Sequence, residues 1–132
     1  MNDDPQWTLE MLFAGRPDCH RLYDGVAAFI GSLGAVRLNV TKTQVSFAGA
    51  RQFAWVWLPI RETPSRPAGS IVVSFALAER IEHPRIVEAV QPYPGRWMHH
   101  VILLSPDELD STLKDWLRAA YAFGQIARGG NR

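Results

Sequence analysis

Two adjacent histidines, His99 and His100, are the residues of this chain best suited to chemistry. They stand in the stretch GRWMHHVILL, between a tryptophan and a run of aliphatic residues. A histidine can act as a general acid or base, or as a metal ligand, near neutral pH. Neighbouring side chains of a regular strand point to opposite faces, so we expect one histidine on each face rather than a chelating pair.

Glu88 is the expected partner of the first histidine. A hairpin that turns at residues 93–96 sets Val90 opposite His99 and places Glu88 diagonally beside it on the same face. A carboxylate beside an imidazole suits acid–base catalysis, but it equally suits a structural hydrogen bond, which is the preferred interpretation. His83 could join these residues as a further metal ligand. The set would lack the tight ligand spacing of known metal sites, so no metal site is predicted.

An aromatic strand, RQFAWVWLP, is the other feature that could carry function. Strand alternation places Phe53, Trp55 and Trp57 on one side, where they form either core beneath helices, the preferred interpretation, or a wall of a ligand pocket. Polar residues stand at the two adjoining turns, and a lysine beside aromatic side chains can hold an anion. These polar residues are Lys42, Thr43, Gln44 and Arg51.

We therefore predict one concave surface of the sheet as the place where a ligand binds. It would be formed by Lys42, Thr43, Arg51, Trp97 as its floor, and whichever of His99 and His100 faces away from the helices. Catalytic residues are not assigned, because the chain has no Gly-x-Ser-x-Gly, phosphate-loop or dinucleotide motif. For the same reason no cofactor is predicted. Cys19 lies on the apolar stripe of a helix, which favours a core residue over a nucleophile.

Composition restricts the class of protein. The chain has 132 residues, with 14 basic and 13 acidic side chains and a net charge of +1, which argues against a dedicated nucleic-acid-binding protein. We expect one domain over residues 1–132, with loose ends. The first ten residues have no basic start or apolar core, and no stretch is apolar enough to span a membrane, so we expect a cytoplasmic protein.

The periodicity of apolar residues predicts an α+β fold. A helix is expected from Pro17 to Gly34, and a second helix is expected after the capping sequence Ser105 to Glu108. Alternating segments between them predict five or six antiparallel strands, with one long loop over residues 60–69. Both helices are expected to cover one face of this sheet and to bury Leu22, Leu113 and Trp116 against it.

Four segments, FAGRP, VTKTQVSF, RQFAWVWLP and GRWMHH followed by a final helix, resemble a bacterial family known only as a domain of unknown function. The resemblance covers residues 8–123 and implies a fold but no activity. A weaker likeness is to iron-chaperone-like proteins of the frataxin type, whose iron surface is an acidic first helix. Here the first helix carries Asp18 and Asp24 beside Arg16 and Arg21, which argues against iron binding.

Taken together, these features predict a small binding or accessory domain rather than an enzyme. The expected partner is a small anionic ligand or a protein on the uncovered sheet face, which a second copy in a homodimer could also cover. The alternative is a small enzyme that uses a sheet histidine as general acid or base, and the third is a metal or iron carrier. Neither a membrane nor nucleic acid is expected as a partner.

Overall fold

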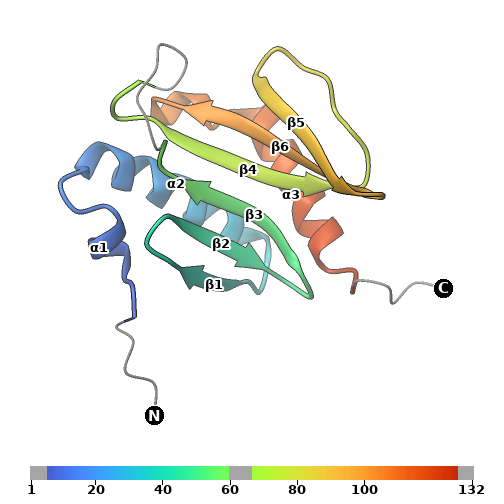
Figure 1. The fold of residues 1–132 in the computed structure, drawn as a ribbon, viewed down its shortest axis with the longest axis horizontal. Coiled ribbons are helices and arrows are strands. Elements are labelled where there is room, and N and C mark those ends of the chain that lie inside the picture. The colour runs from blue at the N-terminus through green and yellow to red at the C-terminus, as the bar shows by residue number, and fades with distance from the viewer. Residues whose placement is uncertain (1–5, 60–66, 128–132) are drawn as a thin grey trace.

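The computed structural model of the chain describes residues 6–59 and 67–127. Helices α2 and α3 lie behind a six-stranded antiparallel sheet (Figure 1), which confirms the predicted α+β fold. Most of the predicted long loop and both chain ends fall outside the described residues. The elements are α1 (Leu9–Leu12), α2 (Pro17–Leu33), β1 (Arg37–Val40), β2 (Gln44–Ala48), β3 (Gln52–Trp57), β4 (Ile71–Leu77), β5 (Ile86–Tyr93), β6 (Arg96–Leu103), the short 3₁₀ helix η1 (Pro106–Glu108) and α3 (Ser111–Gly124).

The strands are ordered β1-β2-β3-β4-β6-β5. The two innermost strands, β3 and β4, are also the two whose residues are apolar on both faces, and almost all of their side chains are buried. A strand in the middle of a sheet with both faces covered reads as a continuous apolar run. The prediction that the aromatic strand is central is therefore confirmed.

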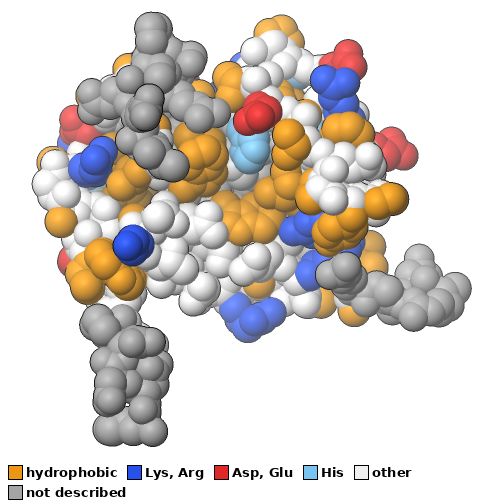
Figure 2. Space-filling model, viewed as in Figure 1, with side chains coloured by type: hydrophobic (Ala, Val, Ile, Leu, Met, Phe, Trp, Pro, Cys, Tyr) orange, Lys and Arg blue, Asp and Glu red, His pale blue; other side chains and the backbone are white. Residues whose placement is uncertain are grey.

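The two faces of the sheet differ in what they contact. The covered face packs against apolar residues of α2 and α3, including Leu22, Val26, Leu113 and Leu117. Its side chains are Val45, Phe47, Ala54, Val56, Ile71, Val73, Phe75, Val101 and Leu103. The opposite face, which we call the outer face, is the one seen in Figures 1 and 2 and carries Trp55, Trp57, Ser74, Met98 and His100.

A β-bulge corrects the predicted arrangement of the aromatic strand. Phe47 pairs with Ala54 but Ala48 pairs with Gln52, so Phe53 is an extra residue between two ladder pairs. Phe53 joins the covered core and meets the Tyr121 ring edge-on, with ring centroids 5.5 Å apart. The expectation that Phe53 shares a face with Trp55 and Trp57 is therefore wrong.

The hairpin of β5 and β6 has a different register from the one predicted. Its turn, Pro94–Gly95, matches a type II turn, because Gly95 has φ +81°. A register shift between Val90 and Tyr93, at the site of Pro92, moves the pairs of Glu88, Ala89 and Val90 by one residue. A second shift, between Ile86 and Glu88, moves the pair of Ile86 by one residue more. Ala89 lies opposite His99, and Glu88 lies opposite His100 rather than beside His99.

The C-terminal helix begins later than predicted. Ser105 forms a capping box on the separate turn η1, after which Leu109 leaves the helical region with φ −80° and ψ 71°. Asp110 then provides a second cap, since its carboxylate accepts a hydrogen bond from the Leu113 N–H at 3.0 Å. The expected burial is confirmed for Leu22 and Leu113, but Trp116 is only half-buried.

Candidate binding site on the outer face of the sheet

One row of side chains crosses the outer face in register. Ser46 pairs with Trp55 and Trp55 with Ser74, Ser74 pairs with His100, and His100 pairs with Glu88. Directly opposed residues of antiparallel strands have Cβ atoms roughly 4.5–5.5 Å apart, so each member of the row is next to the following one. Figure 2 shows hydrophobic side chains gathered around a histidine in the middle of this face, with an acidic side chain next to it.

A chain of hydrogen bonds links Trp57, Ser74 and His100. The Trp57 indole Nε1–H donates to Ser74 Oγ at 2.8 Å, and Ser74 Oγ lies 2.6 Å from His100 Nδ1. An indole can only donate, so the Ser74 hydroxyl accepts from Trp57 and has its own proton left to donate to His100. If that proton is donated to His100, the ring accepts at Nδ1 and, when neutral, carries its own proton on Nε2.

This arrangement holds an imidazole in a fixed orientation on a mainly apolar surface. The His100 ring meets the Trp57 ring edge-on, with centroids 5.8 Å apart, so its position is set by the Trp57 ring and by the hydrogen bond with Ser74. Ser74 is buried, with 1% of its surface exposed, so a substrate has no access to its hydroxyl. Ser74 therefore serves to orient the His100 ring rather than to contact a substrate.

An arginine among aromatic rings closes one end of the outer face. Arg96 is buried, and its guanidinium carbon lies 5.5 Å from the Trp55 ring centroid and 5.9 Å from that of Tyr93. Its Nη2 also donates to the Gln52 carbonyl at 3.0 Å. Such cation–π contacts hold the charge in place beside the row of polar side chains.

His99 lies on the covered face and is fully buried. Its ring stacks on Phe75, with centroids 4.9 Å apart, while Nε2 accepts a hydrogen bond from the Ile81 N–H at 2.9 Å. Burial lowers the pKa of His99, which keeps the ring neutral. The prediction that the two histidines occupy opposite faces of one strand is confirmed, and His99 has no access to the outer face.

The structure does not bring the other predicted site residues together. Lys42 and Thr43 are exposed in the turn between β1 and β2, whereas Arg51 lies in the turn at the opposite end of β2. Arg51 stacks on Phe123, 3.8 Å from the ring centroid, and its Nε donates to the Phe123 carbonyl at 3.4 Å. The role of Arg51 in the fold is therefore to tie this turn to the end of α3.

Trp97 shares the covered side of β6 with His99, where Arg80 lies 5.8 Å from its ring centroid. The strand order puts three strand spacings between β2 and β6, about 14 Å in all. Lys42 is also several residues further along the strand direction, so it lies more than about 15 Å from both histidines. The single concave surface expected from the sequence is therefore not formed, and ligand binding by Lys42 or Thr43 stays a prediction.

Three residues of the outer-face site were missed from the sequence: Ser74, Arg96 and Glu88 as a neighbour of His100. Ser74 could have been found, because it is the single polar residue in the strand Ile71–Leu77. A polar residue on a central strand needs a buried hydrogen-bond partner. The position of Glu88 could not have been found, because it depends on the register shift near Pro92.

Metal and thiol chemistry receive no support from the described part of the chain. Within residues 6–59 and 67–127, no three His, Cys, Asp or Glu side chains lie close enough to hold a metal ion. Cys19 is buried as predicted, and burial raises the pKa of its thiol, which disfavours a reactive thiolate. None of the helices in these two ranges is long and apolar enough to cross a membrane.

Comparison with known proteins identifies the family but no activity. None of the curated proteins and none of the solved structures matches the chain. The model of one family, described as a domain of unknown function (DUF5655), matches residues 10–124. That match includes all the strands, α2 and α3. The chain therefore belongs to the DUF5655 family.

Proposed function

We propose that this domain is a binding module whose outer sheet face holds a small organic acid against His100. The observation that carries the proposal is the hydrogen-bonded chain from Trp57 through Ser74 to His100. A sheet needs apolar side chains to pack, and a buried serine on a central strand has to be satisfied by partners. Here the hydrogen bonds of Ser74 with Trp57 and His100 not only pair the buried hydroxyl but also orient the His100 imidazole on the outer face.

The chemistry of the site suggests which ligand fits. When neutral His100 accepts at Nδ1, its Nε2–H is a donor of the kind that pairs with a carboxylate or carbonyl oxygen. Trp57 and Met98 are half-buried beside it and offer flat or flexible apolar surface to the body of a ligand. Arg96 adds positive charge at the end of the face, whereas Glu88 beside His100 adds a negative charge that disfavours every anion. The apolar body of an organic acid therefore has to supply part of its binding energy.

The proposal is tested by titrating the protein with benzoate and with neutral benzyl alcohol while recording amide and indole N–H signals by NMR. We expect benzoate to shift the Trp57 indole signal and the amides of Ser74 and His100 more than benzyl alcohol does. His100→Phe keeps a flat ring but removes the donor, so it should abolish the preference for benzoate. His83→Phe is the matched control. It makes the same change of residue type, but His83 lies in the segment between β4 and β5 and not in the strands that form the outer face. Equal shifts in wild type and His100→Phe would contradict the proposal.

A second candidate function is general acid–base catalysis by His100. The observation that favours it is the register pair of Glu88 with His100, which places a carboxylate next to the ring. The test is hydrolysis of p-nitrophenyl acetate over a range of pH. If catalysis occurs, His100→Phe should reduce the rate to that of the uncatalysed reaction in buffer, and Glu88→Gln should displace the pH profile. A rate that His100→Phe leaves unchanged would exclude this function.

A further inference from the structure

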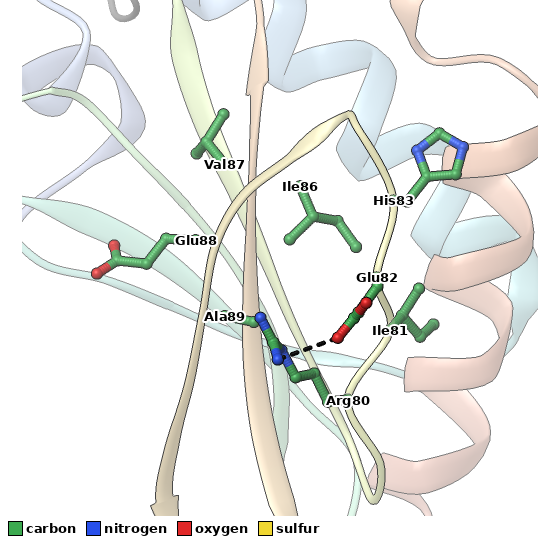
Figure 3. A pocket seen from close by; sticks show the side chains of 8 residues that line it. All are labelled: Arg80, Ile81, Glu82, His83, Ile86, Val87, Glu88 and Ala89. Carbon is green, nitrogen blue, oxygen red and sulfur yellow. Dashed lines mark hydrogen bonds and ion pairs between the residues drawn. The ribbon is translucent and has the colours of Figure 1, made fainter.

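The segment between β4 and β5, residues 78–85, is held to the body of the protein at three points. Ile81 donates its N–H to His99 Nε2 at 2.9 Å. The His83 ring meets the Trp116 ring of α3 edge-on, with centroids 5.0 Å apart, and Figure 3 shows its side chain directed towards that helix. Arg85 forms an ion pair with Asp110 at 2.9 Å.

The Ile81 bond fixes the protonation state of His99. Because Nε2 accepts a hydrogen from a backbone amide, it cannot itself carry a proton. The other ring nitrogen, Nδ1, lies 3.4 Å from the Phe75 carbonyl, which can only accept. Neutral His99 is therefore the Nδ1–H tautomer, and its one acceptor nitrogen holds the linking segment.

Protonation of His99 would remove this attachment. An imidazolium has no acceptor, so a new Nε2–H would oppose the Ile81 N–H. Of the charged or titratable groups around the ring, Arg80 in the segment and His100 on the other side of β6 both disfavour the added charge. The elements packed on the ring offer uncharged groups instead: Phe75 from β4 and Ala89 from β5.

The same segment forms one wall of a pocket. The pocket has a volume of about 280 Å³ and lies between residues 80–83 and the first residues of β5, as Figure 3 shows. Arg80 and Glu82 form an ion pair across 3.2 Å at its rim, and Ile86 and Ala89 line it from the strand. Displacement of residues 80–83 would therefore change the shape of this pocket.

We propose that His99 is an acid-sensitive latch that holds residues 80–83 against the covered face and releases them when its ring is protonated. The inference does not depend on the function proposed for the outer face, because His99 faces the helices and its attachment is to a different segment. Burial lowers the pKa of His99, so release is expected at a pH below the ordinary value for histidine, about 6.5. Arg85, which binds Asp110, keeps the far end of the segment attached.

The test is an NMR titration of the full chain from pH 7.5 to pH 4.5. Ring nitrogen shifts report the tautomer and protonation of His99, and hydrogen exchange reports the protection of the Ile81 amide relative to that of Leu117 in the core. We expect the Nδ1–H tautomer at pH 7.5. The protection of Ile81 should then fall with the same midpoint as His99 protonation, while that of Leu117 persists.

Two variants separate His99 from its neighbour. His83→Phe keeps a ring against Trp116 but cannot titrate, and it should leave the loss of Ile81 protection unchanged. His99→Gln offers a side-chain oxygen to Ile81 and does not titrate, so it should remove the pH dependence. Three results would overturn the proposal: an Nε2–H tautomer at pH 7.5, loss of protection at Ile81 and Leu117 together, or disappearance of the effect in His83→Phe. The first two are measured on wild type, so they stand even if His99→Gln does not fold.

Discussion

His99 and His100 are consecutive residues, yet their rings lie in unlike surroundings. His99 is fully buried, accepts a backbone N–H at Nε2 and stacks on an aromatic core residue. His100 is half-buried, shares a hydrogen bond with Ser74 through Nδ1 and lies among side chains of the outer face. The contrast shows that the face of a strand, and not the residue type, decides whether a histidine lies in the core or among the side chains of the outer face.

The largest expected difference between the faces is in packing. Phe75 is fully buried on the covered face and stacks on both His99 and Trp116. Phe75→Ala should lower the free energy of unfolding by about 3 to 5 kcal/mol, because it opens a cavity that its neighbours cannot fill. Val90→Ala on β5, where 42% of the side chain is exposed, should change it by less than about 0.5 kcal/mol. Similar urea midpoints for the two variants would show that the covered face is not the core.

The two histidines themselves provide the next comparison. His99→Phe should cost about 1 to 3 kcal/mol, because it leaves the Ile81 N–H without its acceptor. His100→Phe should cost about 0.5 to 1.5 kcal/mol, because Ser74 loses one hydrogen bond but its hydroxyl still accepts from Trp57. Urea denaturation at pH 7.5 measures both values. An equal cost for the two changes would mean that Ile81 finds another partner.

The pH dependence of stability should also reveal that His99 is buried in a neutral form. His99 has a lowered pKa when folded, so the unfolded chain takes up the proton first as the pH falls. The stability due to a neutral His99 is therefore complete above about pH 6.5 and declines from there towards the folded pKa. Unfolding free energies measured across this range should fall less steeply in His99→Phe than in wild type. Parallel curves would contradict the assignment of His99 as a buried neutral ring.

Sequence patterns were sufficient for the arrangement of the fold and for the opposite faces of the two histidines. Both follow from local periodicity, since a strand alternates at every residue and α2 keeps its apolar stripe. They were insufficient where the register between two neighbouring strands shifts. The bulge near Ala48 moves Phe53 to the covered face, and the shift before Tyr93 moves Glu88 to His100.

The candidate site was harder to predict than the fold, because its contacts join residues that are distant in the sequence. The Ser74 hydroxyl meets Trp57 and His100, which lie on different strands, and these contacts exist only in one register. A local pattern gives the face of each side chain but not its neighbour across the strands. For the same reason Lys42, Arg51 and Trp97 seemed compatible with one surface until the strand order separated them.

A smaller effect is expected at the start of α3, the helix that lies over Phe75. The Asp110 carboxylate accepts from the Leu113 N–H and binds Arg85, and the Leu113 hydrogen bond is the main reason that the pKa of Asp110 is lowered. Asp110→Ala should cost about 1 kcal/mol at pH 7 through loss of the cap. The lowered pKa means that this stability is present above the ordinary aspartate pKa, about 3.9, and is lost below it.

Asp115 is the matched control on the same helix, because it forms an ion pair with Arg118 in which both side chains are well exposed. Asp115→Ala should change stability by less than about 0.5 kcal/mol. Urea midpoints at pH 7 and pH 3 compare the two variants with wild type. If Asp110→Ala remained less stable than wild type by the same amount at pH 3, the cap would not depend on an ionised carboxylate.

The smallest effect is expected for Lys42→Ala, in the turn between β1 and β2. Lys42 is exposed, and within the described residues its side chain forms no ion pair or hydrogen bond. The turn is held without it, because Thr41 Oγ1 accepts from the N–H groups of Thr43 and Gln44 at 3.3 Å and 3.2 Å. The melting temperature should be almost unchanged, as for surface changes that cost less than about 0.5 kcal/mol, whereas Thr41→Ala should lower it.

Lys42→Ala also sharpens the assignment of the outer face. Because Lys42 is more than about 15 Å from His100, removing its charge should leave the NMR response to benzoate as it is in wild type. His100→Phe, by contrast, should abolish that response. If Lys42→Ala removed the benzoate response while His100→Phe preserved it, the ligand would bind at the turn between β1 and β2. The chain from Trp57 through Ser74 to His100 would then be only a means of satisfying a buried serine.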